Sequence, residues 1–148
     1  MGLWNAIDVS ASGLRATSTW LGVLSHNVAN VNSVRPSDEE PFRSLLIRLA
    51  PQQGSSVSGL SNRHPGGGAV DVGGVRVAGI DESGAEAAIV YDPTHPYADE
   101  DGNVVMPVVD LASQMTDLII ASRQYTLNTR VLQTSREAYQ SALRIGRS

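Results

Sequence analysis

The first thirty residues of the chain place apolar side chains at alternating steps of four and three, the spacing of a helix that packs along one narrow face. Seven of the nine positions in this row are apolar, and the other two are small. A helix of that length would reach about 45 Å, which is long for a small globular domain. The row therefore predicts a helix that needs a partner along much of its length. Its positions are Leu3, Ile7, Ser10, Leu14, Thr17, Leu21, Leu24, Val28 and Val31.

Three asparagines mark the end of this helix. Asn27, Asn30 and Asn32 are followed by Pro36. Asparagine tolerates the left-handed backbone found at helix C-termini and bonds nearby backbone groups. A proline also biases the residue before it away from helical geometry. We therefore expect the helix to end near residue 30.

The last third of the chain repeats the helical spacing after Asp110, a suitable N-cap. A second apolar stripe lies beside the first row, so this helix could contact more than one neighbour. Polar residues within both rows either fix the register of the pairing or are simple imperfections of the seam. The row consists of Leu111, Met115, Leu118, Ser122, Tyr125, Thr129, Leu132, Arg136, Tyr139 and Leu143. The second stripe consists of Ile120, Leu127, Val131, Ala138, Ala142 and Ile145.

The middle of the chain has the pattern of short strands joined by irregular segments. Residues 42–50 (FRSLLIRLA) lie between two prolines. In residues 74–80, Val75 and Val77 alternate with Arg76 and Ala78, and this segment could pair with residues 85–91 through a turn at 81–84. Residues 51–70 are rich in Pro, Gly and Ser, which is typical of a flexible loop. Three short strands are marginally stable unless they pack on a helix. The pattern predicts an α+β fold with a β-rich middle. Its three segments are residues 1–32, 33–107 and 108–148.

Several residue types that carry chemistry are missing. The chain has no Cys, and all 11 basic residues are Arg, which excludes disulfides, thiolate nucleophiles, P-loop lysines and Schiff bases. One Phe, two Trp and four Tyr supply little of the aromatic surface that usually dominates a core. A net charge of −4 without a basic run argues against nucleic-acid binding. No segment has the length of a membrane span or the pattern of a signal peptide, so any export would occur without a cleaved signal.

Three features superficially suggest sites. Residues 99–103 (DEDGN) lack the spacing and the late Glu of an EF-hand, so an acidic turn is the better interpretation. His26, His64 and His95 do not have the spacing of zinc ligands. The triple glycine at 66–68 is not followed by Lys, which favours a flexible linker over a phosphate loop. We therefore expect no metal, no cofactor, no small-molecule substrate and no catalytic residue.

Residues 24–33 (LSHNVANVNS), 91–107 (YDPTHPYADEDGNVVMP) and 123–132 (RQYTLNTRVL) form a set of motifs in order along the chain. The first and third resemble the Asn-rich signature and the C-terminal Tyr-x-x-Asn-x-x-x-Leu motif of the axial proteins of the bacterial flagellum. The second resembles the proximal-rod branch of that family. Asn103, where the family usually has an aromatic residue, and Val108, where an Asn often caps the last helix, depart from the pattern.

The resemblance implies a structural subunit of the flagellar basal-body rod, whose two terminal helices pair as an antiparallel, coiled-coil-like unit and form one core domain. It implies passage through the flagellar export apparatus and assembly with itself and other rod proteins, without nucleic acid and without direct insertion into the membrane. The amides of Asn27, Asn30 and Asn128 are expected to bond backbone or partner amides at subunit contacts, unless they simply face solvent. The expected assembly residues are Leu3, Ile7, Leu14, Leu21, Leu24, Asn27, Val28, Asn30, Val31, Leu111, Met115, Leu118, Tyr125, Asn128, Leu132, Tyr139 and Leu143.

Other interpretations remain open. Another rod or hook-junction protein would share the terminal motifs, and a cytoplasmic coiled-coil adaptor would show the same periodicity. A hydrolase of the cell wall would need an acid and a base positioned in a cleft, and no pair of carboxylates has an apolar context. Because both seams are narrow, we expect the helices of an isolated monomer to be partly disordered until assembly supplies the missing burial.

Overall fold

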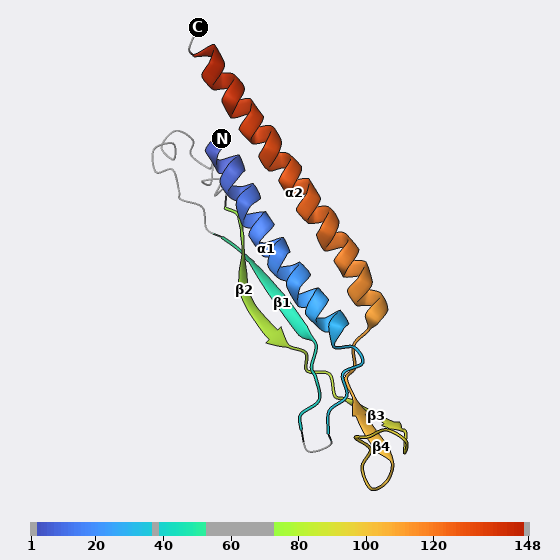
Figure 1. Ribbon diagram of the computed structural model, residues 1–148. Helices are drawn as coiled ribbons and strands as arrows, with labels where there is room; N and C mark the ends of the chain where they lie inside the picture. The colour runs from blue at the N-terminus through green and yellow to red at the C-terminus, as the bar shows by residue number, and fades with distance from the viewer. Residues whose placement is uncertain (1–2, 37–38, 53–72, 147–148) are drawn as a thin grey trace. The chain divides into compact units, whose positions relative to one another are not determined.

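The computed structural model describes residues 3–36, 39–52 and 73–146 of the chain (Figure 1). These residues form helices at both ends and short strands between them, so the predicted α+β class is confirmed. In chain order the elements are α1 (Leu3–Ala29), β1 (Leu45–Pro51), β2 (Val75–Glu82), β3 (Ala88–Tyr91), β4 (Asn103–Met106) and α2 (Leu111–Ile145).

Both predicted helix boundaries are confirmed. α1 ends at Ala29, and the Asn30 amide donates to the backbone carbonyl of His26 at 2.9 Å. α2 begins at Leu111 behind Asp110, whose Oδ1 accepts hydrogen bonds from the backbone N–H groups of Ala112 at 3.1 Å and Ser113 at 3.3 Å. Asp110 thus satisfies N–H groups that would otherwise lack an intrahelical partner.

β1 and β2 form one sheet of two strands. The backbone N–H of Gln52 donates to the carbonyl of Gly74, and that of Ser83 donates to the carbonyl of Ser44, so the end of each strand meets the start of the other. In β2 the predicted alternation is confirmed, because Val75 and Val77 are partly buried whereas Arg76 is exposed. The predicted flexible loop at 51–70 lies, after residue 52, outside the described residues.

The third predicted strand is present, but its predicted partner is wrong. β3 pairs antiparallel with β4, with Ala88 opposite Met106 and Tyr91 opposite Asn103. β2 continues through Glu82, so the predicted hairpin turn at 81–84 does not form and the strands make two separate sheets. The chain returns from β3 to β4 through residues 92–102. Gly102 makes this return possible because its φ of +77° is one that L side chains rarely adopt.

Segments that are far apart in the sequence combine into two compact units. We call residues 1–18, 49–78 and 123–148 the terminal unit, and residues 19–48 and 79–122 the middle unit. Each helix contributes one part to each unit. This division does not test the prediction that the two helices form one core domain.

The buried hydrophobic side chains among the described residues are few and mostly small. They are Ala16, Val23, Leu24, Val104 and Ala121. Polar side chains are buried as well, namely Ser10, Ser12, Thr17, Asn27 and Ser44. Hydrogen bonds must therefore contribute to how these elements are held, because buried polar groups are costly when they lack partners.

Candidate assembly surfaces

Asn27 is the most deeply buried large polar side chain of the middle unit, at 1% exposure. Its Nδ2 donates to the Leu45 carbonyl and to Oε1 of Gln114, both at 2.9 Å, and its Oδ1 accepts from the Leu45 N–H at 2.8 Å. The amide therefore bonds the end of α1 to the start of β1 and to the first turn of α2. All its hydrogen-bonding groups are used, so burial leaves nothing unpaired.

The other two asparagines singled out by the sequence are only partly buried. Asn30 bonds locally to His26 at the helix end. Asn128 lies against Gly13 in the terminal unit, where a Cβ on Gly13 would come within 2.7 Å of Asn128 Nδ2. Gly13 therefore allows α2 to approach α1 closely at this point. A role for these amides at subunit contacts stays a prediction.

Ser12 ties α1 to β2 within the terminal unit. Its hydroxyl donates to the Val9 carbonyl at 2.7 Å and accepts from the Val75 N–H at 3.1 Å. This serine was not singled out by the sequence, because a small polar residue at an inward helical position gives no signal until its strand partner is known. The same holds for Gln114, which the periodicity of α2 places beside the apolar row.

α2 has 35 residues, and Ala121 is its one buried residue among those described. Around this residue, partly buried side chains recur at helical spacing, so the inward face of α2 is narrow. Within the chain, the predicted row is partly buried at Leu118, Leu132 and Tyr139 and exposed at Ser122 and Arg136. The close approach at Asn128 and the hydrogen bond of Gln114 lie on this same inward face of α2.

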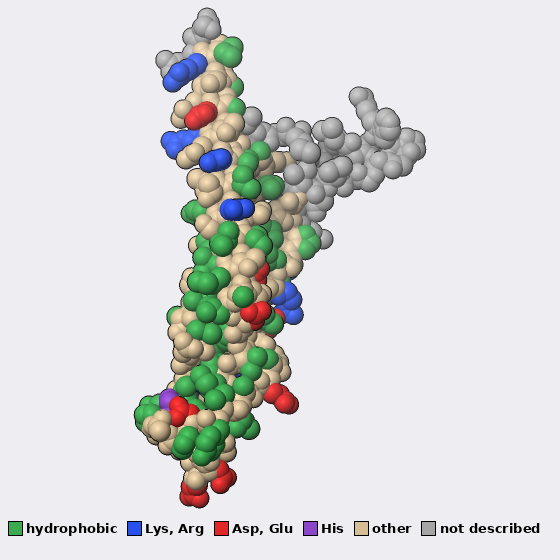
Figure 2. All heavy atoms as spheres, turned by 90° about the vertical axis from the view of Figure 1, so that its right-hand side faces the viewer, with side chains coloured by type: hydrophobic (Ala, Val, Ile, Leu, Met, Phe, Trp, Pro, Cys, Tyr) green, Lys and Arg blue, Asp and Glu red, His purple; other side chains and the backbone are tan. Residues whose placement is uncertain are grey.

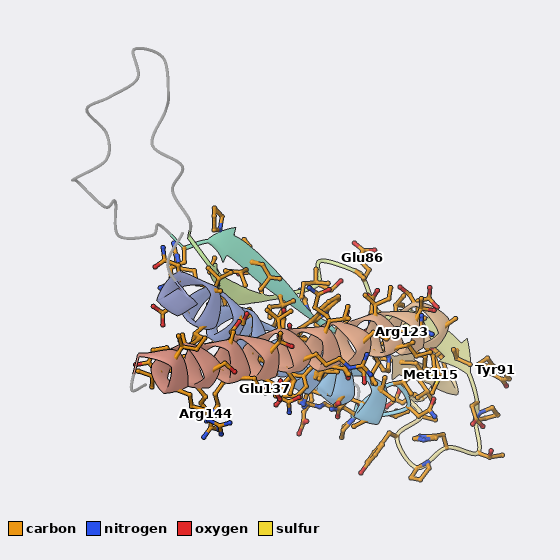
Figure 3. The ribbon with its side chains drawn as sticks, turned by 90° about the horizontal axis from the view of Figure 1, so that it is seen from above. Glu86, Tyr91, Met115, Arg123, Glu137 and Arg144 are labelled. Atoms are coloured by element: carbon orange, nitrogen blue, oxygen red, sulfur yellow. The ribbon has the colours of Figure 1, made fainter. Side chains whose placement is uncertain are left out.

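The rest of α2 carries large apolar side chains that face solvent. Two groups can be distinguished by helical spacing, and both flank the inward face. The first contains Leu111, Met115, Ile119, Tyr125 and Leu143, which are 41–55% exposed. The second contains Ile120, Leu127, Val131 and Ile145, which are 48–76% exposed. Figure 3 shows Met115 projecting from the helix. The second apolar stripe expected from the sequence is thus open in this chain.

The predicted assembly residues divide by their exposure. Leu24 and Asn27 are buried, while Leu111, Met115, Tyr125 and Leu143 are exposed. The side chain of Leu3 lies outside the described part of the chain. The remaining ones are partly buried, namely Ile7, Leu14, Leu21, Val28, Asn30, Val31, Leu118, Asn128, Leu132 and Tyr139.

A second exposed apolar surface, which the sequence did not single out, lies on the β3–β4 hairpin of the middle unit. Ile89 is 72% exposed and Tyr91 is 71% exposed. They are two residues apart in β3 and so lie on the same side of the strand. Tyr91 also projects outward in Figure 3.

In the adjoining turn, Asp99 Oδ1 accepts from the N–H groups of Asp101 at 3.0 Å and Asn103 at 2.7 Å. In the acidic turn predicted at 99–103, the Asp99 carboxylate therefore stabilises the backbone of the turn itself.

Asp92 begins this turn and stays charged. Its Oδ1 accepts from the Thr94 hydroxyl at 2.7 Å and from the Thr94 N–H at 3.1 Å. These hydrogen bonds, with a smaller contribution from nearby His95, hold the pKa of the Asp92 carboxyl below its ordinary value. The carboxylate form is therefore the one present at neutral pH.

Within the described ranges, no group of three or more His, Asp or Glu side chains is arranged to hold a metal ion. Over those same ranges, no helix combines the length and the apolar character that a membrane span requires.

Comparison with known proteins gives a consistent result over the whole length. Residues 101–145 match the family model described as flagellar basal body rod FlgEFG protein C-terminal. The chain is 36% identical over 155 residues to the flagellar basal-body rod protein FlgC of Borreliella burgdorferi, with 98% of each chain covered. It is 35% identical over 150 residues to that of Salmonella typhimurium, covering 99% of each. It is 32% identical over 151 residues to that of Bacillus subtilis, covering 99% of this chain and 100% of the relative.

Proposed function

The chain belongs to the FlgC family of flagellar basal-body rod proteins and is a structural subunit of the basal-body rod, and we propose that the exposed faces of its terminal helices join it to the neighbouring subunits. In this role it passes torque along the rod as part of a rigid array and performs no chemistry of its own. Its partners are further copies of itself and other rod proteins.

The exposed apolar surface of α2 is the observation that supports this mode of assembly. A helix of 35 residues that buries one residue fully gains little stability from its own chain. Large apolar side chains on both flanks of α2 are exposed to water, and this exposure is unfavourable in free energy. Subunits packed against both flanks would bury this apolar surface. A single neighbour on the inward face would leave it exposed to water.

The pairing of α1 with α2 as an antiparallel, coiled-coil-like unit is part of the same proposal. Two contacts between the helices support it, one in each unit. Gly13 allows the close approach of Asn128, and Asn27 donates to Gln114. The residue number thus rises along α1 from Gly13 to Asn27 while it falls along α2 from Asn128 to Gln114, as it does between antiparallel neighbours. Apart from Leu24 and Asn27, which are buried within the chain, the predicted assembly residues on both helices, including Asn30 and Asn128, remain the proposed contacts.

We also propose that the chain reaches the rod through the flagellar export apparatus without cleavage. Family membership supports this route. Intact mass measurement of the chain recovered from purified basal bodies tests it. Its mass should equal that of the same chain isolated from the cytoplasm before export. A smaller mass in the basal bodies would contradict export without a cleaved signal.

Deletion of the gene with complementation tests the rod assignment. Basal bodies from the deletion strain should lack a complete rod in electron micrographs, and the cells should not swim. The native chain supplied in trans should restore both. Complete rods in the deletion strain would contradict the assignment and would favour the alternative of a cytoplasmic coiled-coil adaptor.

A further inference from the structure

Charged side chains are segregated along the chain. Residues 77–122, nearly all of them in the middle unit, contain nine Asp or Glu and no Lys or Arg. Residues 123–148, all in the terminal unit, contain five Arg and one Glu. Figure 2 shows arginine side chains spaced along the later part of α2. The small net charge of the whole chain therefore conceals two regions of opposite sign.

The basic region has a defined face on α2. Arg123, Leu127, Arg130 and Val131 are all exposed. Leu127 lies three or four residues from each of the other three, so they surround it on the helix surface. We call these four residues the basic stripe. None of its arginines forms an ion pair with another residue that the structure describes. Arg123 projects from the helix in Figure 3. The stripe thus presents two apolar side chains beside two unpaired positive charges.

The acidic region has a matching composition. Ile89 and Tyr91 are exposed on β3, and the backbone carbonyl of Gly102 accepts from the N–H of Asp92, which brings the turn against the strand. A Cβ on Gly102 would lie 3.0 Å from the Tyr91 ring, so the turn packs closely on that side chain. Glu100 and Asp101 are exposed at its tip. We call Ile89, Tyr91, Glu100 and Asp101 the acidic patch.

We propose that the basic stripe of one copy of this chain binds the acidic patch of the next copy in the rod. The inference rests on the proposed function and names the partner surface within it. Each surface combines exposed apolar side chains with charges of one sign, and the two signs are opposite. Two identical surfaces would repel each other, so the contact is between different faces of successive copies. Contacts of that kind, when they do not close into a ring, build helical filaments.

Charge reversal with reciprocal rescue tests the contact. The first variant, Arg123→Glu with Arg130→Glu, places negative charge on the stripe. The second, Glu100→Arg with Asp101→Arg, places positive charge on the patch and leaves Asp99, which holds the turn, in place. The third carries all four substitutions and has the net charge of the native chain. All are expressed in the deletion strain and scored by the number of complete rods in electron micrographs and by swimming.

We expect each two-residue variant to lower the number of complete rods by about tenfold or more, because attraction between the charges becomes repulsion. The four-residue variant should restore rods to near the native number, since its two surfaces are again opposite in sign. A matched control, Arg35→Glu with Arg43→Glu, changes the net charge as the first variant does but alters exposed arginines of the middle unit. It should assemble normally.

Three results would overturn the proposal. They are normal rods in either two-residue variant, no rescue by the four-residue variant, or equal loss in the control. No rescue would mean that each surface contacts a partner other than a second copy, such as another rod protein. The rod assignment itself is judged separately, because the deletion strain and the native chain are scored in the same experiment.

Discussion

The side-chain amide of Asn27 acts as a peptide group placed between three segments of the middle unit. It donates to one carbonyl and one amide oxygen and accepts from one N–H, with distances of 2.8–2.9 Å. Only an uncharged carboxamide of this length can supply two donors and an acceptor at that position. The chemical specificity of the site is therefore high, although it involves no ligand.

We predict that Asn27→Asp destabilises the chain by about 3 kcal/mol, because a carboxylate cannot donate to Leu45 or Gln114 and would be buried without a cation. Urea unfolding followed by circular dichroism measures the change. Asn32→Asp is the matched control, since Asn32 is exposed, and its effect should stay within about 0.5 kcal/mol. Equal effects of the two substitutions would show that the buried hydrogen bonds contribute little.

At the level of single residues, the sequence identified Asn27 and the N-cap Asp110 but not the partners of Asn27. An Asn-rich helix end and an acidic residue before an apolar row are local signals. Leu45 and Gln114 bind Asn27, and Val75 binds Ser12, only because the fold brings distant segments together. No local sequence pattern indicates these partners.

Among the elements, the start of α2 depends on one carboxylate. We predict that Asp110→Ala destabilises the chain by about 1 kcal/mol, because the N–H groups of Ala112 and Ser113 lose their acceptor. Thermal unfolding measures the shift. Glu86→Ala removes an exposed carboxylate that caps no helix and should leave the melting temperature nearly unchanged. A shift no larger than that of Glu86→Ala would contradict the capping role.

α2 as a whole is predicted to be only partly formed outside the rod, since its burial within the chain is so limited. Hydrogen exchange measured on the isolated chain should show rapid exchange over residues 123–145 and slow exchange over the same residues in purified basal bodies. Strong protection of this segment in the dilute monomer would contradict coupled folding and assembly.

Helices and strands could be predicted from local sequence patterns, but the pairing of the strands could not. The periodicity of α1 and the alternation of β2 follow from which side chains face inward. The pairing of β3 with β4 depends on a turn of residues 92–102 that closes at Gly102, and its sequence resembles an irregular loop.

The molecule leaves more large apolar surface open than its described core encloses. Its buried hydrophobic residues are mostly small, whereas both flanks of α2 and the hairpin expose Leu, Ile, Met and Tyr side chains. Contiguous exposed apolar patches mark interaction sites in soluble proteins. Fold and family follow from the whole chain, but which patch binds which neighbour depends on surfaces that only the assembled rod brings together.

The most direct test of assembly through α2 compares a substitution on that helix with one outside it. Leu127→Asp places a charge in the middle of the second apolar stripe, and Gln52→Asp adds the same charge at an exposed polar position after β1. Both chains are expressed in the deletion strain, and complete rods are counted in electron micrographs. Leu127→Asp should abolish rods while Gln52→Asp supports them at the native level. Complete rods with Leu127→Asp would contradict assembly through this face.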